Sequence, residues 1–150
     1  MTPSELRERI LADHGHLRRA LADLEKLSHD APARGAAGRE ELRGAGERFL
    51  LQLERHMQHE DDFLLPVLRT IDAWGPERAR HVEQEHREQR EQMRQYLDAL
   101  RQRTAGRAQL ATLLLDLSEW LKRDMAEEEE TTLYPYLLRD DVIGINVEAG

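Results

Sequence analysis

The chain has 150 residues, of which 35% are charged, 5% are aromatic and none is cysteine, and its formal net charge is −8. This length suits one domain with one core, and the negative charge argues against nucleic-acid binding because it repels phosphate backbones. Without cysteine, disulfides, thiolate metal sites and thiol catalysis are excluded, so any bound metal must have nitrogen and oxygen ligands. The sequence shows no signal peptide and no segment apolar enough to span a membrane, and we therefore expect a cytoplasmic protein without a membrane partner.

A first helix is predicted from the N-terminal residues to about Leu27. Thr2 is suited to cap it, Pro3 fits the first helical position, and Glu5 stands where a capping box has its glutamate. The stretch that follows, Ser28 to Arg39, is rich in residues that break helices, and we predict a linker there.

A second helix is predicted from about Glu40 past Pro66, where the missing amide hydrogen should kink or end it. A turn that ends in Gly75-Pro76 leads to a third helix, and a short break leads to a fourth. The third and fourth helices are predicted at about residues 77–103 and 109–135.

These elements predict an all-α fold, namely an antiparallel up-down four-helix bundle that occupies residues 1–138. We expect residues 139–150 to form a short irregular C-terminal tail because they show no helical period. Three apolar residues could pack this tail on the end of the bundle: Val142, Ile143 and Ile145.

Each predicted helix has an apolar stripe, formed by positions that recur every three or four residues. The stripe is predicted at Leu6, Ile10, Leu17, Leu21 and Leu24 in the first helix and at Leu42, Phe49, Leu53, Phe63 and Val67 in the second. Every helix also places at least one side chain of the metal-ligand type in its stripe. The residues concerned are His14, His56, Glu60, His86, Asp124 and Glu128. Taken singly they have structural interpretations: a hydrogen-bonded core histidine, an intrahelical His–Glu contact, or an acidic face in water. Burying all of them would cost several kcal/mol each unless they are paired or bind a metal, so the set as a whole favours metal ligation.

An internal repeat supports this interpretation. The first predicted helix aligns with the third, and the second aligns with the fourth. The matched pairs are Asp13-His14 with Glu85-His86, His56 with Asp124, and Glu60 with Glu128. Two helix pairs related in this way would bring two sets of ligands around a pseudo-twofold axis, which suits two metal ions bridged by two carboxylates.

Over about residues 6–138 the sequence resembles the hemerythrin-like, or HHE cation-binding, domain family. The motifs that carry the resemblance are Asp13-His14, His56-x-x-x-Glu60 with Leu65-Pro66, Glu85-His86, and Glu128 with Leu133-Tyr134-Pro135. The resemblance implies a four-helix bundle that holds a non-haem di-iron centre with two iron ions. Carried over to this chain, it implies terminal ligands at three histidines and bridging ligands at two glutamates: His14, His56, His86, Glu60 and Glu128.

Asp124 departs from the family pattern, which has a histidine at this position. Three imidazoles and three carboxylates form a hard, anionic ligand set that suits iron or manganese, with zinc as a further alternative, and should lower the reduction potential. Because Asp is shorter than His, its metal could be held through water or be lost, which would leave one metal ion. Glu129 rotates out of the stripe, so Glu128 is the predicted ligand. Three residues whose positions favour the rim or surface could replace a missing ligand: His59, His81 and Tyr134.

The expected function is to bind or sense a small ligand, namely dioxygen, nitric oxide or peroxide, at the metal centre. One alternative is an enzyme that disproportionates peroxide or reduces nitric oxide, with an electron-donor protein as partner. The other alternative is a metal-free structural or interaction bundle whose interior polar residues form a hydrogen-bond network. The sequence has no Ser-His-Asp arrangement and no glycine-rich phosphate loop, so the hydrolase and nucleotide-binding classes find no support.

Overall fold

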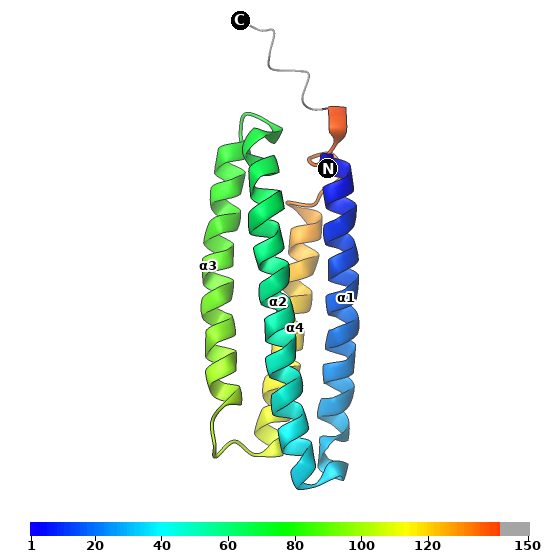
Figure 1. Cartoon of the computed structure of the whole chain (residues 1–150), viewed down its shortest axis with the longest axis vertical. Coiled ribbons are helices and arrows are strands. Elements are labelled where there is room, and N and C mark those ends of the chain that lie inside the picture. The colour runs from blue at the N-terminus through cyan, green and yellow to red at the C-terminus, as the bar shows by residue number, and fades with distance from the viewer. Residues whose placement is uncertain (142–150) are drawn as a thin grey trace, which may run out of the picture.

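The computed structural model describes residues 1–141 and consists of four long helices that lie side by side (Figure 1). They are α1 (Pro3–Asp30), α2 (Ala36–Ile71), α3 (Gly75–Leu100) and α4 (Arg107–Glu130), and the short 3₁₀ helix η1 (Ala31–Arg34) joins α1 to α2. The connections between successive helices lie at alternating ends of the bundle (Figure 1). Residues 1–141 contain no strand, and the prediction of an all-helical fold with four helices is confirmed.

The sequence also predicted the absence of a membrane-spanning segment and the extent of the C-terminal tail. Within residues 1–141, no helix combines the length and the apolar character that crossing a membrane requires. The predicted packing of Val142, Ile143 and Ile145 lies outside the described residues. The predicted division of the chain at residue 138 stays a prediction.

The start of α1 follows the predicted capping pattern. The Thr2 hydroxyl accepts a hydrogen bond from the Glu5 amide at 3.2 Å, and the Glu5 carboxylate accepts one from the Thr2 amide at 2.8 Å. Asp140 accepts hydrogen bonds from the amide and hydroxyl of Ser4 at 3.0 and 2.7 Å. The positive end of the α1 dipole stabilises a carboxylate at this place, so the end of the described chain is attached to the start of α1.

The linker predicted for residues 28–39 is wrong in extent. α1 continues to Asp30, η1 follows directly, and α2 begins at Ala36. The alanines of this stretch are strong helix formers, and they outweigh the breaking tendency of their neighbours. Gly35 separates η1 from α2, and its φ of 64° disfavours residues with a side chain.

Pro66 does not end α2, which continues to Ile71. Proline removes one backbone hydrogen bond from a helix, but Leu64, Leu65 and Leu68 around it are buried, and their packing outweighs that loss.

The C-terminal boundaries of α3 and α4 also come earlier than predicted, at Leu100 and Glu130. In α4 four consecutive glutamates, residues 127–130, stand at the negative end of the helix dipole. Their charges disfavour a further helical turn, so the chain leaves the helix before Tyr134 and Pro135.

A layer of polar side chains divides the apolar core into two clusters. The larger cluster includes Leu17 to Leu24 of α1 and Met93 to Leu100 of α3, and the smaller one includes Leu6 and Ile10 of α1. Along the chain, four of the predicted ligands fall between a segment of one cluster and a segment of the other: His14, Glu60, His86 and Glu128. The buried polar residues of this layer are His14, His56, Glu60 and His86.

The predicted apolar stripe is confirmed for α1 but partly wrong for α2. Phe63 was expected in the core but is 44% exposed, whereas Leu64 is 0% exposed. Phe63 packs edge-on against His59 instead, with 4.7 Å between the ring centres. Neighbouring residues are turned by about 100° on a helix, so this choice depends on the rotation of α2 against its neighbours.

Candidate metal centre

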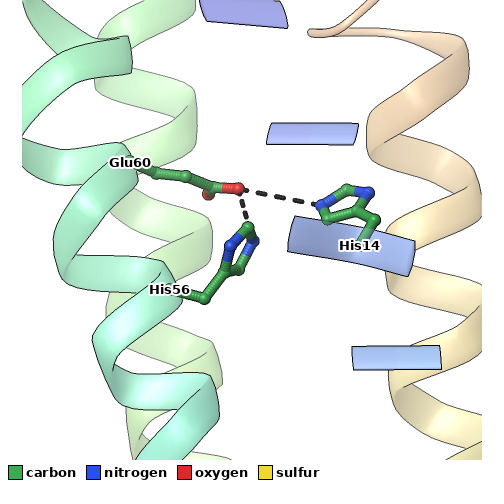
Figure 2. Close-up of side chains that lie close together, drawn as sticks. All are labelled: His14, His56 and Glu60. Atoms are coloured by element: carbon green, nitrogen blue, oxygen red, sulfur yellow. Dashed lines mark ion pairs between the residues drawn. The ribbon is translucent and has the colours of Figure 1, made fainter. Parts of the chain in front are cut away.

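Glu60 of α2 lies at the centre of the polar layer and is 1% exposed. Its Oε1 atom lies 2.7 Å from Nε2 of His56, one turn earlier on α2, and 3.9 Å from Nε2 of His14 on α1. Its Oε2 atom lies 3.0 Å from Nε2 of His86 on α3. Figure 2 shows the rings of His14 and His56 directed toward the Glu60 carboxylate. One carboxylate therefore faces imidazoles from three helices.

Helical spacing explains why these polar side chains are buried. His14 comes four residues after Ile10 and three before Leu17, and both of these apolar residues are buried. α1 cannot place them in the core without placing His14 there as well. His56 and Glu60 are four residues apart and so share one face of α2.

Several buried nitrogen and oxygen atoms of this layer make no hydrogen bond. They are both ring nitrogens of His14, Nδ1 of His56, Oε1 of Glu60 and Oε1 of Glu128. The 2.7 Å approach of His56 to Glu60 lacks the angle that a hydrogen bond needs. Each such unpartnered group costs about 1–3 kcal/mol, so native proteins contain few of them. One or more cations that accept these lone pairs would satisfy the whole group.

The donor atoms of His14, His56 and Glu60 are spaced for a single metal ion. One atom from each residue lies within 4.8 Å of the other two. Ligands bound at about 2.1 Å to one ion are roughly 3–4 Å apart, so only a small contraction is needed. Imidazole nitrogen and carboxylate oxygen bind iron, manganese and zinc. The residues present therefore fit a metal ion.

The two interior glutamates have opposite pKa shifts. Burial raises the pKa of Glu60, but the three surrounding imidazoles outweigh burial and hold this pKa well below its usual value. Burial and the negative charge of Glu60 raise the pKa of Glu128 well above its usual value. Two buried carboxylates so close together cannot both be charged without a positive charge between them. A bound cation would supply it.

In the absence of metal, the acidic surroundings favour protons on two of the imidazoles. Burial lowers the pKa of His56, but Glu60 and Asp13 outweigh burial and raise it. Burial likewise lowers the pKa of His86, but Glu60 and Asp61 outweigh it and raise this pKa too. The same acidic surroundings that favour protonated imidazole would favour a metal cation.

A family model for the hemerythrin HHE cation-binding domain matches residues 5–137. The chain belongs to this family. No curated protein and no solved structure is found to match it. Membership of the hemerythrin family and the cluster of His14, His56 and Glu60 together indicate that the chain binds metal.

The remaining predicted ligands of this hemerythrin-family chain surround the same space less tightly. His86 contacts Oε2 of Glu60, and Oε1 of Glu128 lies 3.9 Å from Nε2 of His14. The side chain of Glu128 is 17% exposed, although its Oε1 atom is covered. The structure thus brings five of the six residues into one layer, and their role as ligands stays a prediction.

Asp124, the residue that departs from the hemerythrin pattern, is the sixth. It is half-buried, and its Oδ2 atom accepts a hydrogen bond from Nε2 of Gln89 on α3 at 2.6 Å. Burial raises the pKa of Asp124 more than this hydrogen bond lowers it. Asp124 is therefore hydrogen-bonded to α3, and it lines the same pocket as His86 and Glu128.

Three carboxylates lie at the ring nitrogens that face away from Glu60, and sequence analysis did not predict these contacts. They are Asp61 at 2.5 Å from Nδ1 of His86, Asp13 at 3.7 Å from Nδ1 of His56, and Glu129 at 3.7 Å from Nδ1 of His14. Glu129 is turned out of the stripe, as predicted, and binds Arg18 through two hydrogen bonds of 2.6 and 2.7 Å. The only signal in the sequence was that each carboxylate directly follows or precedes a predicted ligand.

The residues considered as replacement ligands lie at the rim or on the surface. His81 and Tyr134 are exposed, and His59 is half-buried. Nδ1 of His59 faces the carboxylate of Asp13 at 3.5 Å, at the rim of the layer.

Two pockets reach the layer from opposite sides. A pocket of about 620 Å³ between α3 and α4 is lined by His86, Asp124 and Glu128, together with other acidic residues. A pocket of about 590 Å³ between α1 and α2 is lined by His56 and His59. Small molecules can therefore approach the candidate metal centre from the solvent.

Proposed function

We propose that this chain is a non-haem di-iron protein that binds or senses dioxygen, nitric oxide or peroxide at a centre inside an antiparallel four-helix bundle. The observation that carries the proposal is the group of buried, unpartnered nitrogen and oxygen atoms that faces one space between two apolar clusters. A metal-free hydrogen-bond network would leave fewer of these atoms without a partner, so it explains the layer less well.

The two oxygens of Glu60 support two metal ions instead of one. Oε1 faces His14 and His56, whereas Oε2 faces His86. A carboxylate with imidazoles on both of its oxygens is suited to bridge two ions. In this proposal His14 and His56 hold one ion and His86 holds the other.

The second bridging ligand in the proposal is Glu128, and Asp124 completes the set. The raised pKa of Glu128 reflects burial and the charge of Glu60, and a cation would offset both effects. Iron is the proposed metal, with manganese or zinc accommodated by the same nitrogen and oxygen ligands.

Reduced iron with a free coordination position would supply the electrons and the binding site for a small diatomic gas or peroxide. The chain's own residues contribute access and exclusion. The pocket between α3 and α4 is lined by Glu85, Glu127 and Glu130 as well as by the predicted ligands. Such an acidic entrance disfavours anions and admits small neutral molecules.

A second candidate function is an enzyme that converts two molecules of hydrogen peroxide into water and dioxygen, or that reduces nitric oxide. The 620 Å³ pocket favours it, because solvent access allows substrate exchange. Reduction of nitric oxide would require an electron-donor protein as partner. We further propose a cytoplasmic location, where such donors are available.

The test is metal analysis and spectroscopy of protein purified without chelator. The proposal expects about two iron ions per chain and a visible absorption band on oxidation that shifts when azide is added. Peroxide consumption no faster than that of free iron would favour the binding function over the enzyme. Protein that takes up no iron, manganese or zinc under any condition would contradict both.

A further inference from the structure

Asp61 connects the candidate metal centre to the surface of the protein. It follows Glu60 on α2, and its Oδ1 atom lies 2.5 Å from Nδ1 of His86 on α3. Its Oδ2 atom accepts a hydrogen bond from Nη2 of Arg90, one turn after His86, at 2.7 Å. Arg90 also donates to Glu54 on α2 at 3.1 Å. The carboxylate of Asp61 is therefore held between an imidazole and a guanidinium group.

The contact with Asp61 favours one of the two neutral forms of the His86 ring. Both ring nitrogens face a carboxylate, but the contact of Nδ1 with Asp61 at 2.5 Å is shorter than that of Nε2 with Glu60 at 3.0 Å, and a neutral ring that donates to Asp61 carries its proton on Nδ1. Nε2 then carries a lone pair, and it faces Oε2 of Glu60 at 3.0 Å. Two lone pairs at this distance repel each other unless a proton or a metal ion lies between them. The contact with Asp61 thus prepares His86 to bind a cation through Nε2.

His86 differs in this respect from the other two interior histidines. The outward Nδ1 atoms of His14 and His56 have no hydrogen-bond partner. Their nearest carboxylates lie 3.7 Å away, beyond hydrogen-bond distance. The orienting contact is made at one of the three rings.

We propose that Asp61 is a positioning residue that fixes the ring orientation and tautomer of His86 for one of the two metal ions, and that Arg90 holds Asp61 in place. The inference rests on the proposed function, because it concerns the ion bound at His86. A carboxylate behind a metal-binding imidazole increases the electron donation of the ring and commonly raises metal affinity by about 10- to 100-fold.

The test compares Asp61→Leu and Asp61→Asn with the same changes at Asp62. Asp62 is the next residue of α2 and is exposed. Its carboxylate accepts a hydrogen bond of 3.0 Å from the side-chain amide of Gln58. Leucine removes both the acceptor and the charge, whereas asparagine keeps an acceptor oxygen and removes the charge. The four variants therefore separate the hydrogen bond from the charge, and the Asp62 variants control for charge alone.

Zinc is the probe, because it is diamagnetic, and two quantities are measured. In titrations against a coloured chelator, Asp61→Leu should weaken one of the two zinc-binding steps by about 10- to 100-fold and leave the other unchanged. The affinity of Asp61→Asn for zinc in the weakened step should lie between those of Asp61→Leu and the wild type. In nitrogen-15 NMR of the zinc-loaded protein, a slowly exchanging proton on Nδ1 of His86 should be seen in the wild type and in Asp61→Asn but not in Asp61→Leu. A general loss of structure would affect both binding steps, and Asp61→Asn tests the proposal even if Asp61→Leu does not fold.

Equal zinc affinities in the Asp61 and Asp62 variants, with the Nδ1 proton of His86 unchanged, would overturn the role of Asp61. In that case, two metal ions bound by the wild type would still support the proposed function. A wild-type chain that binds no zinc, iron or manganese would instead overturn the proposed function itself. The two failures are therefore distinguishable.

Discussion

The half of the centre on α1 and α2 differs from the half on α3 and α4, although the sequence repeats between them. On the first side His14 and His56 are buried, and their outward nitrogens have no hydrogen-bond partner. On the second side His86 is held by Asp61 at 2.5 Å. Nδ1 of His14 faces Glu129, which Arg18 binds, at 3.7 Å. The repeat therefore reproduces the histidine and the carboxylate behind it, but the contact is within hydrogen-bond distance only at His86.

The matched residues His56 and Asp124 show the same contrast. His56 is 9% exposed and faces Glu60, whereas Asp124 is half-buried and accepts a hydrogen bond from Gln89. Asp124 also lines the pocket between α3 and α4. Each half borders a pocket, but the first half consists of two buried imidazoles, whereas the second half also includes the half-buried carboxylates of Asp124 and Glu128. We expect the first half to retain metal and the second half to govern exchange and reactivity.

The largest effect is expected at Glu60, because it belongs to both halves. Glu60→Gln removes the negative charge that both sets of imidazoles face, and metal content should fall from about two ions per chain toward zero. Elemental analysis measures this directly, and the matched control is Glu47→Gln, at a half-buried position of α2 where the carboxylate pairs with Arg101. Retention of both ions by Glu60→Gln would show that Glu60 does not join the halves.

Single histidine deletions should separate the halves. His86→Ala should leave about one ion per chain, because His14, His56 and Glu60 remain together as a ligand group. His56→Ala should remove the ion that His86→Ala retains. Chelator titrations of the two variants check this, and the comparison fails if each variant loses both ions.

Asp124→His should tighten metal binding on the α3–α4 side by several fold, because imidazole reaches farther than the Asp carboxylate and would not be held by the same Gln89 hydrogen bond. The measurement is the weaker of the two binding constants, and Asp116→His, at an exposed position of α4, is the control. A lower iron content in Asp124→His would mean that Asp124 is not a ligand in the native centre.

The smallest effect is the dependence of stability on pH. The pKa values of His56 and His86 are raised above 6.5 in the folded, metal-free chain. The stability that their protonation contributes is therefore present below pH 6.5 and is lost as the pH rises through the folded-state values. The pKa of Glu128, raised above 4.5, acts in the same direction. Metal binding needs the deprotonated groups, so the metal-bound chain should show the opposite trend.

Melting temperatures measured with chelator and with added metal, from about pH 6 to about pH 8, test these signs. The melting temperature of the protein in chelator should fall as the pH rises. The difference between the melting temperatures with metal and with chelator should become larger over the same pH range. A melting temperature in chelator that rises with pH would contradict the protonation scheme.

The fold and the central residues could be predicted from the sequence because they depend on the period of a single helix. Ile10, His14 and Leu17 share one face of α1 whatever the neighbouring helices do. The burial of His56 with Glu60 follows in the same way from their spacing on α2.

The outer contacts could not be predicted, because they depend on how one helix is rotated against another. Asp61 is one residue from Glu60, and only the placement of α3 beside α2 shows that it binds His86. The hydrogen bond between Asp124 and Gln89 likewise crosses from α4 to α3. The linker prediction failed for a different reason, since the alanine content of this stretch favours helix: α1 continues to Asp30, η1 follows it to Arg34, and α2 begins at Ala36.

The most direct measurement is anomalous diffraction at the iron absorption edge from crystals of the iron-loaded protein. Two iron peaks are expected between the apolar clusters, one within bonding distance of His14 and His56 and the other of His86, with Glu60 between them. No peak in this layer, or iron bound only at exposed carboxylates, would contradict the central claim that this layer binds metal.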